Sequence, residues 1–126
     1  QLAKTEKNTI ICDFYNANPS SMAAAITNLN SLSSTNKVAI LGDMFELGDE
    51  SAAQHQRIIE FAIKNEISTL IFVGHHFYNA KGDVDANFFA TPTEAAEFIQ
   101  KQDWKDTLVL LKGSRGMALE QLLPLL

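Results

Sequence analysis

The side chains most able to do chemistry lie in one short polar stretch, residues 13–18. They are a carboxylate, a phenol and two amides, on Asp13, Tyr15, Asn16 and Asn18. Asn18 is a natural helix N-cap, and Pro19 suits the first helical position, where its missing N–H leaves nothing unpaired. Because a helix start offers free N–H groups and a partial positive charge, the pattern predicts a ligand-binding loop. A plain capped turn is the alternative, although capping does not require Asp13, Tyr15 or Asn16.

A second candidate stretch, residues 112–116, places two cations beside two glycines and a serine. Lys112, Ser114 and Arg115 suit the binding of a carboxylate or phosphate, and the Arg115 guanidinium can make a bidentate contact. A solvated strand end is the plainer interpretation. A third stretch, residues 42–49, is too apolar for an idle surface loop, so we expect it to be packed or to face a substrate.

The other reactive residue types have structural explanations. Adjacent His75 and His76 lack a third metal ligand at a recognisable spacing, so a surface loop is the expected setting. Cys12 lies inside an apolar strand and is expected in the core, not as a nucleophile. His55 is expected to be a surface or packing residue and not a catalytic one.

The elements that must position these residues alternate along the chain. Apolar or β-branched runs predict strands, and apolar residues three and four apart predict helices. Strands are expected at residues 1–5, 9–14, 37–41, 69–73, 87–90 and 107–111. Helices are expected at residues 19–32, from 51, at 77–81, from 92 and over the leucine-rich residues 119–126. The predicted capping boxes are Ser51 with Gln54, for which Asp49 is an alternative cap, and Thr91 with Glu94.

This alternation predicts an α/β fold, a three-layer, doubly wound, mostly parallel sheet of about six strands with an antiparallel edge strand at the N-terminus. Strands that are continuously apolar fit a sheet covered by helices on both faces. Ligands of such sheets gather beyond the carboxyl ends of the strands. We therefore expect one edge of the sheet to carry the polar stretches 13–18, 42–49, 74–76 and 112–116.

Composition narrows the class of protein. The 126 residues, 46% of them apolar, suit a single domain with one core. The net charge of −5 is spread along the chain without a basic stripe, so no nucleic-acid partner is expected. No apolar run approaches the roughly 18 residues of a membrane span, and no signal peptide is visible. Since a single cysteine fits a reducing compartment, we expect a cytoplasmic protein without membrane insertion.

Three common catalytic signatures are absent from the sequence. It contains no phosphate-binding Gly-x-x-x-x-Gly-Lys-Ser/Thr loop, no Gly-x-Gly-x-x-Gly dinucleotide fingerprint and no nucleophile elbow. We therefore expect this chain to catalyse nothing alone.

Three motifs in order resemble a known family. Tyr15–Pro19 followed by Ser-Met, the run Lys37–Asp49 and the run Lys112–Met117 are similar to the C-terminal domain of Mur ligases, the ATP-dependent ligases of peptidoglycan precursors. The first two motifs resemble the branch that adds D-alanyl-D-alanine to UDP-N-acetylmuramoyl-tripeptide. The resemblance implies a Rossmann-like domain spanning residues 1–126. It also implies that an N-terminal UDP-sugar-binding domain and a central ATPase domain belong to the whole enzyme.

The resemblance implies a reaction as well. In the family, ATP phosphorylates the tripeptide carboxylate, Mg²⁺ neutralises the phosphates, and the dipeptide amine attacks the acyl phosphate. The C-terminal domain closes over the central domain and excludes water. By motif position, the nucleotide would face Asp13, Tyr15, Asn16 and Asn18. Asp43 would line the reaction cleft, and the dipeptide would be held by Lys112, Ser114 and Arg115.

Two alternatives stay open at this point. One is a related ligase of the folylpolyglutamate type, which shares fold and ATP chemistry but acts on another substrate. The other is a stand-alone regulatory binding module of the doubly wound type, with ligand affinity of its own and no catalytic partner.

Overall fold

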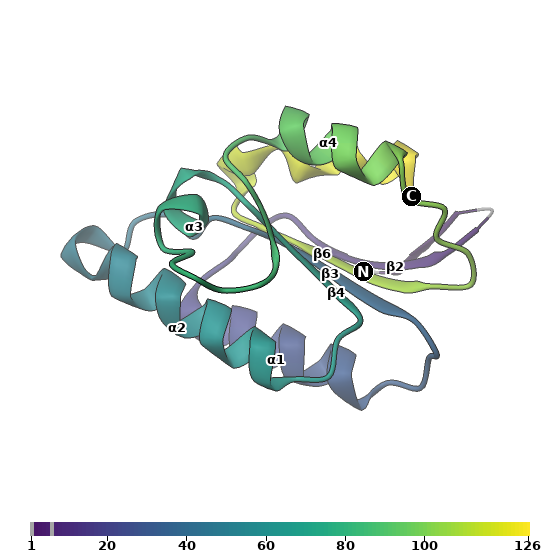
Figure 1. The fold of residues 1–126 in the computed structure, drawn as a ribbon, viewed down its shortest axis with the longest axis horizontal. Helices are drawn as coiled ribbons and strands as arrows, with labels where there is room; N and C mark the ends of the chain where they lie inside the picture. Colours follow the sequence, from purple (N-terminus) through teal and green to yellow (C-terminus); the bar gives the residue numbers. More distant parts are fainter. Residues whose placement is uncertain (1, 6) are drawn as a thin grey trace.

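The computed structural model describes residues 2–5 and 7–126. A six-stranded sheet in the order β1-β2-β6-β3-β4-β5 lies between two layers of helices (Figure 1). Only β1 is antiparallel, to β2, and the other pairs are parallel. The strands are β1 (Leu2–Lys4), β2 (Thr9–Asp13), β3 (Lys37–Gly42), β4 (Thr69–Val73), β5 (Asn87–Phe89) and β6 (Leu108–Lys112). The predicted three-layer, mostly parallel sheet with an antiparallel edge strand is confirmed.

Helices cover both faces of this sheet. One face carries α1 (Pro19–Ser31), α2 (Ser51–Lys64) and the short α3 (His75–Asn79). The opposite face carries α4 (Pro92–Gln100) and the 3₁₀ segment η3 (Leu119–Leu125), as Figure 1 shows. The crossovers through α1, α2 and α3 pass on one face of the sheet and the crossover through α4 passes on the other, which makes the sheet doubly wound.

Strand residues alternate between two cores. In β6, Val109 and Leu111 face α4 and η3, whereas Leu110 faces α1 and α2. The two cores also explain why the strands read as continuous apolar runs, since both faces of the central strands are buried. Cys12 lies in the α4-side core, as expected, and burial raises the pKa of its thiol above the ordinary value.

Two predicted helix starts are confirmed. Asn18 Oδ1 accepts from the backbone N–H of Ser21 at 2.9 Å, and Ser21 Oγ accepts in return from the N–H of Asn18 at 3.0 Å. Thr91 Oγ1 accepts from the N–H of Glu94 at 3.3 Å. These bonds satisfy donors that the first helical turn leaves open.

The predicted capping box of Ser51 with Gln54 is wrong. The chain enters α2 through a 3₁₀ turn, η1 (Gly48–Glu50), whose helical geometry continues directly into Ser51. The Ser51 hydroxyl lies 3.3 Å from Nδ1 of His55 instead, one turn further along the helix.

The predicted α-helix over the C-terminal leucines is also wrong. That segment forms two 3₁₀ turns, η2 (Arg115–Met117) and η3, separated by Ala118 in the left-handed conformation with φ 55°. Pro124 lies inside η3 and has no N–H to extend an α-helical ladder. Leu119, Leu122 and Leu126 are nevertheless buried, since apolar spacing alone does not separate the two helix types.

One helix begins earlier than predicted. The helix expected at residues 77–81 is α3, which starts two residues earlier, so His75 and His76 are exposed helix residues and not loop residues. The predicted first strand and its turn include Gln1 and Glu6, which lie outside the described residues.

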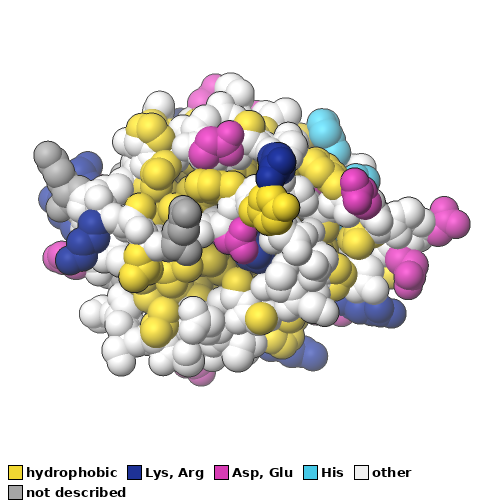
Figure 2. Space-filling view, turned by 180° about the vertical axis from the view of Figure 1, so that it is seen from behind, with side chains coloured by type: hydrophobic (Ala, Val, Ile, Leu, Met, Phe, Trp, Pro, Cys, Tyr) yellow, Lys and Arg dark blue, Asp and Glu magenta, His cyan; other side chains and the backbone are white. Residues whose placement is uncertain are grey.

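No helix in the described part of the chain is long and apolar enough to cross a membrane. On the face shown in Figure 2, acidic and basic side chains are interspersed around a hydrophobic band.

Candidate functional site

The carboxyl ends of β2, β6, β3 and β4 meet at one edge of the sheet, here called the carboxyl edge. From β2 and β3 the chain turns towards α1 and α2, whereas from β6 it turns towards the opposite face. Such divergence opens a crevice beside the strand, which is where open α/β sheets bind ligands. Backbone hydrogen bonds join the loops, from Gly113 N to Asp13 O at 3.2 Å and from Ser114 N to Asp43 O at 3.4 Å. The structure thus brings the predicted polar stretches together.

An ion pair joins the loop after β2 to the end of β6. Nζ of Lys112 lies 2.6 Å from Oδ2 of Asp13 and 2.8 Å from the carbonyl oxygen of Asn16. The Lys112 side chain is 2% exposed and that of Asp13 is 44% exposed. Lys112 therefore directs its charge at the loop, and Asp13 keeps one side open to solvent.

The charge of the Asp13 carboxylate is stabilised by these contacts. Partial burial acts to raise its pKa, but the hydrogen bond from Lys112 and that from the N–H of Tyr15, 3.1 Å from Oδ1, together hold the pKa below the ordinary value. Asp13 is consequently ionised at neutral pH and able to accept hydrogen bonds from a ligand's hydroxyl groups.

Tyr15 and Arg115 form a second link between the same two loops. The Arg115 guanidinium lies over the Tyr15 ring, 4.6 Å from its centroid, and the Tyr15 side chain is 74% exposed. Both side chains line a hollow of about 480 Å³, together with Cys12, Asp13, Phe14 and Glu120. An exposed ring and a planar cation beside a carboxylate offer stacking, anion binding and hydrogen-bond acceptance in one place.

Asn16 and Asn18 follow Asp13 in the loop after β2, and Ser114 precedes Arg115 in the loop after β6. The side chain of Asn16 is exposed, whereas Oδ1 of Asn18 is engaged in capping α1. Ser114 is half-buried between Lys112 and Arg115. Among these residues, Asn16 and Arg115 have the side chains most open to a ligand.

Asp43 is buried and organises a neighbouring part of the carboxyl edge. Its two carboxylate oxygens accept from the N–H groups of His76 and Phe77, each at 2.9 Å, at the start of α3. Asp43 also contributes to the wall of a smaller hollow of about 240 Å³, beside Phe45 and Gly74. Its oxygens are already bonded to backbone, so its contribution to a cleft is to hold the loops that form the wall.

His55, expected to be a surface or packing residue, is a packing residue and is 0% exposed; sequence reasoning missed its hydrogen bonds. Its Nε2 accepts from the N–H of Met44 at 3.0 Å, and its Nδ1 donates to the Ser51 carbonyl at 2.7 Å. Although Asp43 lies 3.9 Å from Nε2, the lone pair of that nitrogen is used by Met44, so the contact is not an ion pair. Burial lowers the pKa of His55, against smaller raising effects of Ser51 and Asp43.

The burial of His55 is indicated by the sequence. His55 shares a helical stripe with Ile58, Ile59 and Ala62, which are buried with it. Positions three, four and seven residues apart lie on one helix face, so the stripe indicates a packed histidine. Its imidazole stacks on His76, with ring centroids 5.1 Å apart.

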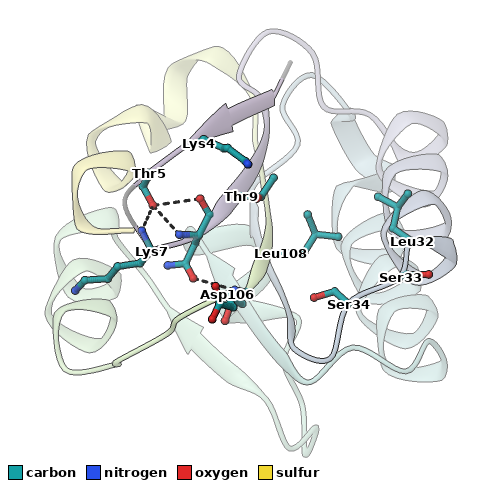
Figure 3. A pocket seen from close by; sticks show the side chains of 11 residues that line it. Lys4, Thr5, Lys7, Thr9, Leu32, Ser33, Ser34, Asp106 and Leu108 are labelled. Atoms are coloured by element: carbon teal, nitrogen blue, oxygen red, sulfur yellow. Dashed lines mark hydrogen bonds between the residues drawn. The ribbon is translucent and has the colours of Figure 1, made fainter.

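A larger hollow of about 550 Å³ lies at the opposite edge of the sheet, between the starts of β2 and β6 (Figure 3). Two of its polar side chains, those of Thr5 and Asn8, already bond to backbone. Thr5 Oγ1 bonds to the carbonyls of Asn8 and Leu126, and Asn8 Nδ2 donates to Leu126 O at 2.7 Å. These hydrogen bonds hold chain segments together, so the larger size of this hollow does not make it the candidate site.

Within residues 2–5 and 7–126, no group of three or more His, Cys, Asp or Glu side chains is placed to hold a metal ion.

Comparison with known proteins identifies the kind of domain. The family model for "Mur ligase, glutamate ligase domain" matches residues 1–115. The UDP-N-acetylmuramoyl-tripeptide--D-alanyl-D-alanine ligase of Treponema pallidum is 38% identical over 125 residues, which are 94% of this chain and 27% of that protein. The enzyme of the same name from Rickettsia prowazekii is 29% identical over 126 residues, or 97% of this chain and 28% of that protein.

Solved structures agree with the sequence comparison. A crystal structure of MurF from Acinetobacter baumannii superposes with a TM-score of 0.86 at 30% identity, covering 98% of this chain and 28% of that one. MurF ligase from Thermotoga maritima, solved in complex with ADP, superposes with a TM-score of 0.81 at 24% identity, which shows the shared fold. The chain thus spans less than a third of the length of these relatives.

Proposed function

The chain belongs to the Mur ligase family, and from that premise we propose that it is the C-terminal domain of an ATP-dependent ligase joining D-alanyl-D-alanine to UDP-N-acetylmuramoyl-tripeptide. The names of the relatives from Treponema and Rickettsia support this substrate pair. The whole enzyme would add a UDP-sugar-binding domain and a central ATPase domain. These would be the partners of this chain, within the cytoplasm.

The observation that carries the proposal is the double link between the loops after β2 and β6. Asp13 with Lys112 and Tyr15 with Arg115 hold the two loops against one open hollow. A ligase needs two reactants side by side, because most of its advantage comes from orientation. Two loops from adjacent strands, one with acceptors and a ring and one with a cation, meet that need.

The chemistry of each loop favours a different reactant. Asp13 and the Asn16 side chain can accept hydrogen bonds from ribose hydroxyls, and the exposed Tyr15 ring can stack on a base. The start of α1, capped by Asn18, lies at the end of this loop. We assign this loop to the nucleotide. Arg115, with Ser114 beside it, is assigned to the dipeptide carboxylate, and Asp43 to the cleft wall.

ATP and Mg²⁺ belong to the proposal for the whole enzyme. ATP supplies the phosphoryl group that activates the tripeptide carboxylate, and Mg²⁺ offsets the phosphate charge. The residues at the carboxyl edge fit the sugar and base of a nucleotide, since they offer an acceptor carboxylate and an open ring. Because the sequence has no phosphate-binding loop, the grip on the phosphates is assigned to the central domain.

Dipeptide-dependent release of ADP tests the proposal. The full-length gene product is assayed with UDP-N-acetylmuramoyl-tripeptide and ATP, with and without D-alanyl-D-alanine, beside the 126-residue chain alone. We expect release by the full-length product only when the dipeptide is present, and none from the chain alone. Release that ignores the dipeptide would overturn the substrate assignment.

A second candidate is the addition of glutamate, which the description of the matching family model names. The discriminating arm of the assay replaces the dipeptide by L-glutamate and the nucleotide tripeptide by a folate. Release in that arm alone would place the enzyme with the folylpolyglutamate type. Ligand affinity in the isolated chain, without any ligase activity of the full-length product, would favour a regulatory binding module.

A further inference from the structure

We propose that Lys112 is a positioning residue, which orients the loop after β2 and acts on the substrates through Asp13. The inference rests on the proposed function, since it assigns a task within the same site. It separates Lys112 from Arg115, although the two cations lie three positions apart in one motif.

Two contacts of the Lys112 ammonium reach one short segment. Nζ donates to Oδ2 of Asp13 at 2.6 Å and to the carbonyl oxygen of Asn16 at 2.8 Å. The first contact fixes a side chain and the second fixes the backbone three residues further on. Together they hold the loop at both ends of the segment that carries Tyr15.

Burial makes this arrangement difficult to exchange for a substrate contact. The Lys112 side chain is 2% exposed. A buried ammonium is tolerated when it is paired and hydrogen-bonded, and removing its partner is strongly unfavourable. If Nζ turned to a substrate carboxylate, Asp13 and the Asn16 carbonyl would lose their donor. Arg115 is exposed and is free of that restriction.

A chain of bonds carries the effect of Lys112 to the ligand surface. Lys112 holds Oδ2 of Asp13, and Oδ1 of the same carboxylate accepts from the N–H of Tyr15 at 3.1 Å. The Tyr15 ring and the open side of Asp13 then face the hollow. Loss of Lys112 should therefore weaken the binding of the nucleotide, which is the reactant assigned to this loop.

Kinetics of the full-length ligase separate the two cations. In Lys112→Met we expect the apparent KM for ATP to rise about tenfold or more, because two charge-assisted hydrogen bonds are lost, with a smaller change in the KM for D-alanyl-D-alanine. Arg115→Met should show the opposite pattern. Lys105→Met, an exposed lysine with a weak surface ion pair to Asp103, is the matched control and should change neither KM.

A double-mutant cycle asks whether Lys112 works through Asp13. Once Asp13→Asn is present, adding Lys112→Met should raise the KM for ATP by a smaller factor than it does in the wild type, because the contact between the two charged groups is already lost and only the bond to the Asn16 carbonyl remains. The proposal is overturned if the two effects multiply. It is equally overturned if Lys112→Met raises the KM for the dipeptide and leaves that for ATP unchanged.

A second measurement on the 126-residue chain does not depend on the reaction. In Lys112→Met, the NMR order parameters of the Tyr15 and Asn16 amides should fall from about 0.85 towards 0.6 or below, while those of β3 remain unchanged. Unchanged order at Tyr15 would overturn the positioning role. If order falls as expected but the wild-type full-length product shows no dipeptide-dependent ADP release, the proposed function fails while the positioning role stands.

Discussion

The backbone N–H of Met44 donates a hydrogen bond to Nε2 of His55, and the two nitrogens lie 3.0 Å apart. Because Nδ1 of the same ring donates to the Ser51 carbonyl, His55 is held as the neutral tautomer with its proton on Nδ1. The imidazole thus ties the loop after β3 to the first turn of α2. That loop also contains Asp43, whose carboxylate holds the start of α3.

We predict that this histidine makes the stability of the chain sensitive to mild acid. Burial lowers the pKa of His55, so the unfolded chain takes up its proton more readily than the folded chain. The contribution of neutral His55 to the free energy of unfolding should be fully present above about pH 6.5, the ordinary pKa of a histidine. It should be lost progressively as the pH falls from there towards the lowered pKa. Urea unfolding at a series of pH values measures the slope of the free energy of unfolding against pH.

His55→Gln is the control for that slope. The glutamine amide oxygen can still accept from Met44 but does not titrate, so its free energy of unfolding should vary less below about pH 6.5 than that of the wild type. His75 and His76 are exposed and stay in both proteins. Equal slopes for wild type and His55→Gln would show that His55 does not cause the acid sensitivity.

A pair of glycine substitutions tests the packing beneath Asp43. Gly74 has φ 127°, and a Cβ added there would collide with the Asp43 carboxylate. Gly74→Ala should cost more than about 4 kcal/mol or prevent folding, because strain and collision act together. Gly82→Ala, with φ 52° but open space around it, should cost only about 1 kcal/mol. Similar melting temperatures for the two variants would contradict the packing described for Asp43.

Asn8 should be the most important polar side chain at the opposite edge. It is 5% exposed, donates to the carbonyls of Trp104 and Leu126, and accepts from the N–H of Thr107 at 3.0 Å. Asn8→Ala leaves these groups without their partner and should lower the free energy of unfolding by about 3 kcal/mol. Asn28→Ala, at an exposed position of α1, should change it by less than about 0.5 kcal/mol. A loss below about 1 kcal/mol for Asn8→Ala would contradict the network.

Arg115 should determine the affinity for the dipeptide. Arg115→Ala in the full-length ligase removes the exposed guanidinium and should raise the apparent KM for D-alanyl-D-alanine about tenfold or more. Lys105→Ala removes a remote surface charge and serves as the control. Steady-state assays at saturating ATP give both values. An unchanged KM in Arg115→Ala would remove Arg115 from the dipeptide site.

The fold was predictable because its signals are local. The apolar run of β4 and the Asn18 and Thr91 caps each need only neighbouring residues, and the structure confirms them. The C-terminal turns were not predictable in the same way. Leu119 and Leu122 fit either helix type, and the left-handed Ala118 that divides the turns has no sequence signature.

For the site, only the edge of the sheet that carries it could be predicted from the sequence. Polar stretches after parallel strands had to meet there, but which side chains would pair depended on the sheet order. Lys112 and Asp13 are 99 residues apart in sequence and become neighbours because β6 lies beside β2. A sequence pattern shows two cations in residues 112–116, and only the packing shows that one is enclosed and the other open.

The most direct test of the proposed ligase is the mass of its product. The full-length gene product is incubated with ATP, Mg²⁺, UDP-N-acetylmuramoyl-tripeptide and D-alanyl-D-alanine. The mass of the UDP-N-acetylmuramoyl peptide is then measured by mass spectrometry. The account predicts a gain of one dipeptide less one water, which requires ATP. An unchanged tripeptide mass in the presence of ATP, or the same gain without ATP, would contradict it.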